Sequence, residues 1–348
     1  MKNYIHLHRF IILTACFTFL LVIAGGMVTS TDSGLSVPDW PTTYGHFMFS
    51  FPLDQMVGGI FYEHSHRMIA SFVGFLTVIL AIWLWKKEER RWVRNLGFAA
   101  LGAVLAQGVL GGLTVLFLLP PLVSVSHATL AQTFFSIIIA LSLITSSWWR
   151  SDQPLTGEKG KSVSTSTIAL VTSVLVYLQL IIGALMRHTH SGLAVPDFPL
   201  AYGQLFPSLS PESLDLYNRQ LIQMNLRLAA DDPITASQII IHMVHRCMAL
   251  LVSGGVVWTS YRLLASRGQS RRLFSIGLVL LVLLISQVTL GALTVLTAKN
   301  VIIATAHVAN GAALLACCIL AFLHSVRLFG FKLKPRPGVV MSIKEATA

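Results

Sequence analysis

The chain has 348 residues, of which 54% are hydrophobic and only 11% are charged, and its formal net charge is +11. Soluble proteins carry about 25% charged residues, so this sequence cannot cover the surface of a water-soluble fold of its size. The composition also excludes a disordered chain. The four cysteines lie in or against apolar runs, which excludes a secreted domain held by loop disulfides.

Apolar runs long enough to cross a bilayer occur eight times. A transmembrane helix needs about 20 such residues. The runs lie at roughly 10–30, 67–85, 96–118, 127–149, 166–186, 243–264, 273–297 and 302–325. The first run is long enough to span, and no signal-peptide cleavage pattern follows it. We therefore expect an all-α integral membrane protein with eight transmembrane helices.

The basic residues predict the orientation of these helices. The segments on one side of the predicted spans contain 19 of the 25 Lys and Arg residues. These segments are 1–9, 86–95, 150–165, 262–272 and 326–348. Because cytoplasmic loops are rich in Lys and Arg, we expect a multi-pass protein of the cell's inner or plasma membrane with both termini cytoplasmic. The basic excess then reflects topology and attraction to anionic lipid, and no nucleic-acid partner is expected.

The sequence contains an internal repeat of a unit of four spans. The segment SGLSVPDWP at 33–41 recurs as SGLAVPDFP at 191–199, and QGVLGGLTVL at 107–116 recurs as QVTLGALTVL at 287–296. A loop insertion near 207–233 explains why the offset between copies changes. Each unit has an even number of spans, so both enter the bilayer in the same sense, as parallel repeats do. We expect two parallel-repeat four-helix bundles.

The repeat also predicts domain boundaries. They are an N-terminal bundle in 1–150, a cytoplasmic linker in 151–165, a C-terminal bundle in 166–326 and a cytoplasmic tail in 327–348.

Four histidines recur at equivalent positions, and they are His66, His127, His245 and His307. Each lies near the outward start of an even-numbered span, so all four share one depth. Ionisable residues in spans usually mark function. Two imidazoles on helices of one bundle can ligate an iron from opposite faces of a porphyrin, which supplies the other four ligands. One haem site in each bundle is therefore predicted; the alternative is interfacial histidines bound to backbone or headgroups.

Charged residues near these histidines differ between the units. Arg67 and Arg246 directly follow a candidate ligand, so each is expected to pair with a haem propionate or to reach lipid headgroups. Glu63 precedes His66 by three residues, so the two share a helix face. In the second unit the residue three before His245 is His242, which is not a carboxylate. A carboxylate near haem can move protons or stabilise positive charge; the alternative is an interfacial residue. The difference predicts one reactive and one supporting bundle.

Taken together, these motifs resemble the haem A synthase family over about residues 10–326. The resemblance rests on the ExxHR-type start of the second span, the SGLxVPDxP loop, the QxxLGxLTVL segment and the duplicated histidines. It implies an oxidoreductase that converts the C8 methyl group of haem O to the formyl group of haem A by successive hydroxylation, for cytochrome oxidase assembly. Haem O synthase is an expected partner. An unidentified electron donor is also expected, because no nucleotide-binding fingerprint is present.

The resemblance also implies a role for each residue. His66 and His127 match the pair that binds the substrate haem, Glu63 matches a catalytic glutamate, and His245 and His307 match the ligands of a haem b cofactor through its iron. Many bacterial members have two cysteines around the PDW motif. In this chain the corresponding residues are Val37, Thr43, Val195 and Ala201.

Two other functions fit some of these features. A di-haem b-type membrane electron-transfer protein, such as a quinol oxidoreductase, would have equivalent halves, and the difference between Glu63 and His242 argues against it. A transporter with proton-coupling histidines would place ionisable residues near the midplane on broken helices, whereas these histidines lie near span ends.

Overall fold

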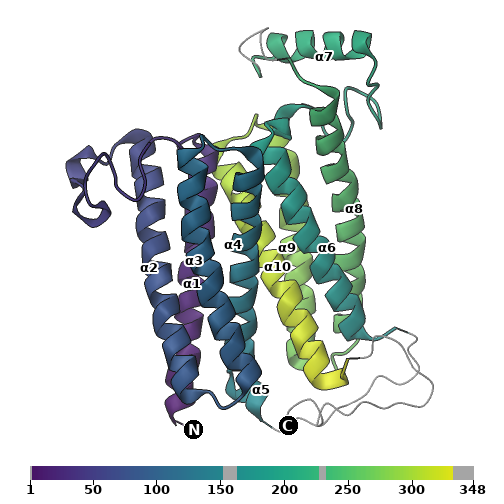
Figure 1. Cartoon of the computed structure of the whole chain (residues 1–348). Coiled ribbons are helices and arrows are strands. Elements are labelled where there is room, and N and C mark those ends of the chain that lie inside the picture. The colour runs from purple at the N-terminus through teal and green to yellow at the C-terminus, as the bar shows by residue number, and fades with distance from the viewer. Residues whose placement is uncertain (1, 152–162, 227–232, 332–348) are drawn as a thin grey trace.

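The computed structural model describes residues 2–151, 163–226 and 233–331, and within them the regular structure is helical (Figure 1). Eight of the helices are long and apolar enough to cross a membrane, which confirms the predicted all-α membrane class. They are α1 (Lys2–Ser30), α2 (Gly58–Lys87), α3 (Arg91–Leu116), α4 (Pro121–Ile144), α6 (Thr165–His188), α8 (Ala236–Leu264), α9 (Arg271–Leu296) and α10 (Val301–Phe329).

Five short helices lie between the spans. They are η1 (Met48–Ser50), η2 (Leu53–Gln55), α5 (Ser147–Arg150), η3 (Ser191–Leu193) and α7 (Pro211–Gln223). Helix α7 occupies the insertion that distinguishes the second unit from the first, and it lies across the top of the molecule in Figure 1. Much of the predicted linker 151–165 and of the predicted tail 327–348 falls outside the described residues.

The even-numbered spans begin earlier than hydropathy predicts. Helix α2 starts at Gly58 instead of 67, and α8 starts at Ala236 instead of 243. Polar residues in these first turns lower the hydropathy without breaking the helix, and α8 opens with a capping box between Thr235 and Gln238. Consequently the four recurring histidines lie roughly 9–14 Å along their helices from the first residue, at a rise of 1.5 Å per residue.

The spans pack as two groups of four. In the first group α1 contacts α2 and α4, and α3 contacts α2 and α4; in the second, α6 and α9 each contact α8 and α10. The groups meet where α10 contacts α1 and α4, and where α4 contacts α6. Helix α10 is therefore central, and more than half of its most hydrophobic stretch is buried. Close packing of this kind drives helix association in membranes.

The two SGLxVPDxP loops fold alike at one end of the bundles, called here the loop end. Asp39 accepts hydrogen bonds from the backbone N–H groups of Tyr44 (2.8 Å) and Gly45 (2.9 Å), and Asp197 does so from Tyr202 and Gly203. Burial acts to raise the pKa of Asp39, but the hydrogen bonds outweigh it and lower this pKa. Each aspartate thus closes a turn and presents its loop in a fixed shape to the helices below.

Candidate functional site

The structure brings the recurring histidines together in two pairs. His66 on α2 interacts electrostatically with His127 on α4, and His245 on α8 does so with His307 on α10. All four side chains are partly buried near the loop end of the bundles. Each bundle therefore holds one imidazole pair, as the repeat predicts.

Each of the four imidazoles lies against a glycine of a neighbouring helix. A Cβ atom would come within 3.0–3.3 Å of the ring in the pairs Gly25 and His66, Gly111 and His127, Gly183 and His245, and Gly291 and His307. Such distances are closer than a side chain tolerates without displacing its neighbour. The glycines thus leave room for the imidazoles between closely packed helices.

Sequence reasoning found only half of this arrangement. Gly111 and Gly291 lie in the QxxLGxLTVL motif, whose glycines explain close approach, but Gly25 and Gly183 lie in no motif singled out above. The signal that could have revealed them is their spacing, which has the same offset as the two loop motifs.

The imidazole environment fits a porphyrin with two axial histidines. The Nδ1 atoms of His127 and His307 are buried without a hydrogen-bond partner, and such an atom calls for a ligand, ion or water at that atom. Within the described residues, no group of three or more His, Cys, Asp or Glu could hold a metal ion. A metal that brings most of its own ligands, as haem iron does, matches a site with only two protein ligands.

Glutamines support the histidine-bearing helices. Gln107 Nε2 donates to the backbone oxygen of His127 (2.7 Å), and Gln179 Nε2 donates to that of His245 (3.0 Å). Both bonds run between neighbouring spans, so they fix the depth of one helix against another. They involve the backbone of the histidine and therefore hold its position along the bundle.

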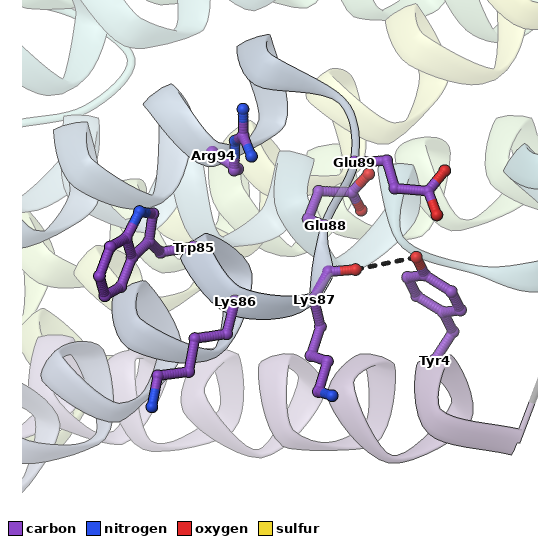
Figure 2. A pocket seen from close by; sticks show the side chains of 7 residues that line it. All are labelled: Tyr4, Trp85, Lys86, Lys87, Glu88, Glu89 and Arg94. Carbon is purple, nitrogen blue, oxygen red and sulfur yellow. Dashed lines mark hydrogen bonds between the residues drawn. The ribbon is translucent and has the colours of Figure 1, made fainter.

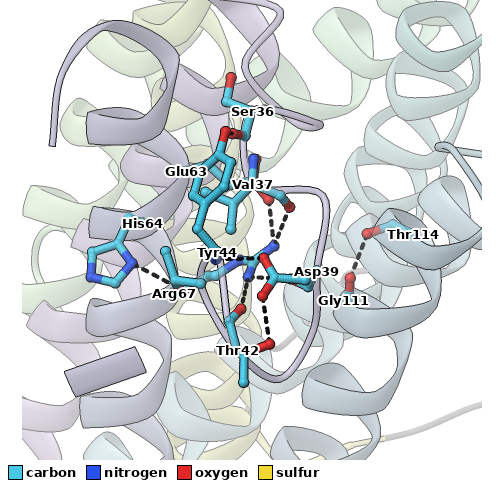
Figure 3. Close-up of polar contacts among 11 residues, drawn as sticks. Ser36, Val37, Asp39, Thr42, Tyr44, Glu63, His64, Arg67, Gly111 and Thr114 are labelled. Atoms are coloured by element: carbon cyan, nitrogen blue, oxygen red, sulfur yellow. Dashed lines mark hydrogen bonds and ion pairs between the residues drawn. The ribbon is translucent and has the colours of Figure 1, made fainter. Parts of the chain in front are cut away.

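Glu63 is buried in a network that joins α2 to the first loop (Figure 3). Its side chain is 5% exposed, its Oε1 accepts from Arg67 Nη2 (2.7 Å), and its Oε2 accepts from the backbone N–H of Val37 (2.8 Å). A carboxylate with these two partners is not an interfacial group solvated by headgroups. The second bundle differs, since buried His242 hydrogen-bonds through Nδ1 to the oxygen of Ser191 (3.0 Å).

Arg67 fastens the first loop to α2. Its Nη1 donates to the backbone oxygens of Asp39 (2.8 Å) and Thr42 (3.0 Å), and its Nη2 donates to that of Val37 (2.8 Å). His64, also on α2, has its Nδ1 3.1 Å from Oγ1 of Thr43 in the same loop.

Arg246 does the same in the second bundle. It donates to the backbone oxygens of Val195 (3.2 Å), Asp197 (2.6 Å) and Leu200 (2.8 Å). Pairing of Arg67 and Arg246 with propionates stays a prediction, whereas the loop contacts give both residues a structural role that the sequence did not reveal.

The first loop also contacts the helix that lies against His127. A Cβ atom on Gly112 would lie 2.5 Å from Trp40 Cδ2, and the preceding residue, Gly111, contacts His127. The indole therefore lies beside the helix that cradles a candidate ligand. Trp40 is 40% exposed, so it covers this part of the bundle from the loop side.

A surface pocket of about 410 Å³ lies at the opposite end of the first bundle (Figure 2). Its lining consists of Tyr4, Trp85, Lys86, Lys87, Glu88, Glu89 and Arg94. The Tyr4 hydroxyl donates to the backbone oxygen of Lys87 (2.8 Å). None of these residues is a histidine, and the length of α2 separates the pocket from His66, so it does not belong to the candidate site.

Known proteins of similar sequence indicate what such a site does. Residues 8–319 match COX15-CtaA, a family described as cytochrome oxidase assembly protein. The chain belongs to this family. It is 26% identical to the heme A synthase of Lysinibacillus sphaericus, across 83% of this chain and 85% of that protein. It is also 26% identical to the heme A synthase of Shewanella oneidensis, across 87% of this chain and 91% of that protein.

A third relative is more similar over a shorter stretch. The heme A synthase of Bacillus pumilus is 31% identical across 64% of this chain and 70% of that protein. The family match covers all eight spans except the first residues of α1 and the last residues of α10. It confirms the resemblance inferred from the loop motif, the glycine-rich segment and the duplicated histidines.

Proposed function

We propose that this membrane protein is a haem A synthase, an oxidoreductase that converts the C8 methyl group of haem O to a formyl group for cytochrome oxidase assembly. Two successive hydroxylations would give a gem-diol that loses water to the aldehyde. The observation that carries the proposal is that two glycine-cradled histidine pairs occur in a chain of this family, and within the described residues only the first pair has a buried carboxylate one helical turn away.

The two pairs take different porphyrins in this proposal. His66 and His127 hold the substrate haem O, and His245 and His307 hold haem b, in each case through the iron. The domain assignment follows, with substrate in 1–150 and cofactor in 166–326. When bound, haem would supply the redox chemistry that oxidation of an unactivated methyl C–H bond requires, while the protein positions the methyl group and controls protons.

Glu63 is the proton-handling group. Its Oε1 is held by Arg67 and its Oε2 by the N–H of Val37, so the carboxylate is oriented and its negative charge is balanced. It lies one helical turn from His66 on the same face of α2. Hydroxylation of a carbon releases and takes up protons, and a buried acid–base group at this place can accept or return them at its oxygens.

The first loop keeps this region dry and ordered. It holds Glu63 through Val37, places the Trp40 indole beside Gly112, and is itself fixed by the guanidinium group of Arg67. Excluding water strengthens the electrostatic interactions of a site and limits side reactions. The loop of the second bundle is tied down by Arg246 in the same way but meets no carboxylate on α8.

The surroundings of the site complete the proposal. The protein lies in the cell's inner or plasma membrane with cytoplasmic termini, as the Lys and Arg distribution supports. Haem O synthase supplies the substrate, and a separate donor supplies electrons.

Extraction of haems from the purified protein tests this function. Haem O or haem A should be found beside haem B, and haem A should form in cells that make haem O. Haem B alone, in two equivalent low-spin sites, would contradict the proposal and support the di-haem electron-transfer alternative.

A further inference from the structure

Arg187 joins the two bundles beside the second histidine pair. It lies in the last turn of α6, and its Nη2 donates to the backbone oxygen of Gly26 (3.1 Å) and to Ser30 Oγ, both on α1. Ser30 Oγ also accepts from Thr305 Oγ1 (3.1 Å) on α10, two residues before His307. A polar chain thus connects α6, α1 and α10 at the depth of the histidines.

The turn of α1 that contains Gly25 and Gly26 lies between the two histidine pairs. A Cβ atom on Gly25 would lie 3.1 Å from Nε2 of His66, and one on Gly26 would lie 3.3 Å from Cγ2 of Thr305. One face of this turn therefore meets the first pair, and the other face meets the helix turn that carries His307. Arg187 lies on the second side, and its charge acts on His307.

The charge of Arg187 has no carboxylate in direct contact within the described part of the chain. The ion pairs found there are those of Arg67 with Glu63, and of Arg90 and Arg150 with Glu88. Asp32 acts on Arg187 only at longer range. A partly buried cation is costly unless an anion compensates it, and the hydrogen bonds of Arg187 to Gly26 and Ser30 both use Nη2.

We propose that Arg187 binds a propionate carboxylate of the porphyrin held by His245 and His307. This inference rests on the proposed haem sites. A guanidinium group can engage a carboxylate through two parallel N–H donors, and a positive charge beside haem favours the reduced iron and so raises its reduction potential. Arg187 thereby anchors the haem in the second bundle and ties it to α1, the helix that lines the first site.

The test is the reduction potential of the purified holoprotein, measured by spectroelectrochemistry in the parent and three variants. Arg187→Gln should lower the potential and weaken haem retention by about 10- to 100-fold, the usual effect of losing a hydrogen bond to a charged group. Arg187→Lys keeps the charge and should retain most of the potential. Ser30→Ala removes the side-chain contact of Arg187 with α1 but leaves the contact with the Gly26 oxygen and the charge, so it should keep the parental potential.

Two outcomes would overturn the inference. Arg187→Gln with the parental potential and haem retention would show that the residue only joins the bundles, as would a Ser30→Ala variant that loses as much as Arg187→Gln. If Arg187→Gln does not fold, redox-difference infrared spectra of protein with ¹³C-labelled haem propionates decide the matter. Arg187→Lys should shift the propionate carboxylate bands, and unshifted bands would refute the contact.

Failure of the proposed function would look different. In that case the parent itself would show no six-coordinate low-spin haem spectrum, or the spectrum would survive replacement of both His245 and His307. A normal spectrum with an unchanged potential in Arg187→Gln would refute only the inference about Arg187.

Discussion

Glu63 and Arg67 form a buried ion pair on one turn of α2, with Arg67 Nη2 2.7 Å from Glu63 Oε1. Both residues also bind the first loop, Glu63 through the N–H of Val37 and Arg67 through backbone oxygens. The proposed proton-handling group and the loop that covers it are therefore one structural unit. A change that loosens the loop should also disturb the carboxylate.

Replacing Glu63 with Gln should slow the chemistry far more than it weakens haem binding. The amide cannot act as an acid or base, and loss of one positioned acid–base group costs about 10²- to 10⁴-fold in rate. Glu63→Gln should fold, retain haem b and accumulate haem O or its singly hydroxylated product. The measurement is chromatography of haems extracted from cells that express the variant.

His242 provides the matched control for Glu63, because it occupies the equivalent position and is equally buried. His242→Gln should be much milder, since the residue hydrogen-bonds to the oxygen of Ser191 and carries no carboxylate. If Glu63→Gln makes haem A at the parental rate, Glu63 has no acid–base role and serves only to hold the first loop.

The second histidine pair should account for a haem b spectrum. Two imidazole ligands give a six-coordinate low-spin iron, so His245→Ala or His307→Ala should remove this signal from purified protein. The corresponding changes of His66 and His127 should abolish haem A formation while leaving much of the haem b in place. Retention of the low-spin spectrum in both C-terminal variants would move the cofactor site elsewhere.

The glycine cradles give a test that does not alter any ligand. A Cβ at Gly111 would lie 3.3 Å from Cε1 of His127, whereas one at Gly108, a turn earlier on α3, would meet nothing within 4 Å. Gly111→Ala should displace the imidazole and lower haem A formation; Gly108→Ala should not. Helix propensity favours alanine over glycine by roughly 0.5–1 kcal/mol, so a weaker helix would not explain a loss. Equal activity of the two variants would argue against the cradle.

The sequence predicts the spans well because hydropathy and charge act over about 20 residues at a time. It places the four histidines together because the repeat relates them. Helix starts were predicted too late at α2 and α8, since each hydrogen-bonded helix begins several residues before its apolar run does. The same limitation put the histidines at span ends, although the structure places them about two turns inside.

Contacts between distant segments could not be predicted from the sequence. The loop partners of Arg67 lie 25–30 residues before it, and Arg187 reaches Ser30 across more than 150 residues. No periodicity relates such pairs. They depend on how the loop folds over α2 and how α6 meets α1, and both are results of packing.

Thiol chemistry should not affect activity. The four cysteines are Cys16, Cys247, Cys317 and Cys318, and all are free and lie within spans. The loops at 31–57 and 189–235 contain no cysteine, and hydrogen bonds made by Asp39 and Arg67 hold the first loop. Haem A formation should withstand thiol reductants and membrane-impermeant alkylating reagents added from the loop side. A marked loss under either treatment would contradict the placement of the cysteines.

Glu88 should contribute stability that depends on pH. Its side chain is 1% exposed, accepts from Arg90 Nε (2.9 Å), and forms an ion pair with Arg150, so it joins the end of α2 to α5. Burial acts to raise the pKa of Glu88, but the hydrogen bonds and charges of Arg90 and Arg150 outweigh it and lower this pKa. Because the pKa is lower in the folded state, the stabilisation is present above the unfolded value of about 4.3 and is lost as pH falls through the folded value.

The expected result is a lower unfolding temperature for Glu88→Gln in detergent at pH 7, with a loss of about 1–3 kcal/mol, since a buried partner of two arginines is removed. As pH falls from about 4.3 through the lower folded-state pKa of Glu88, the parent should progressively lose the same contribution, so the two unfolding temperatures should converge in acid. Glu89→Gln is the control, because the adjacent Glu89 is exposed. An unfolding temperature of Glu88→Gln that equals that of Glu89→Gln at pH 7 would show that this ion-pair cluster does not stabilise the fold.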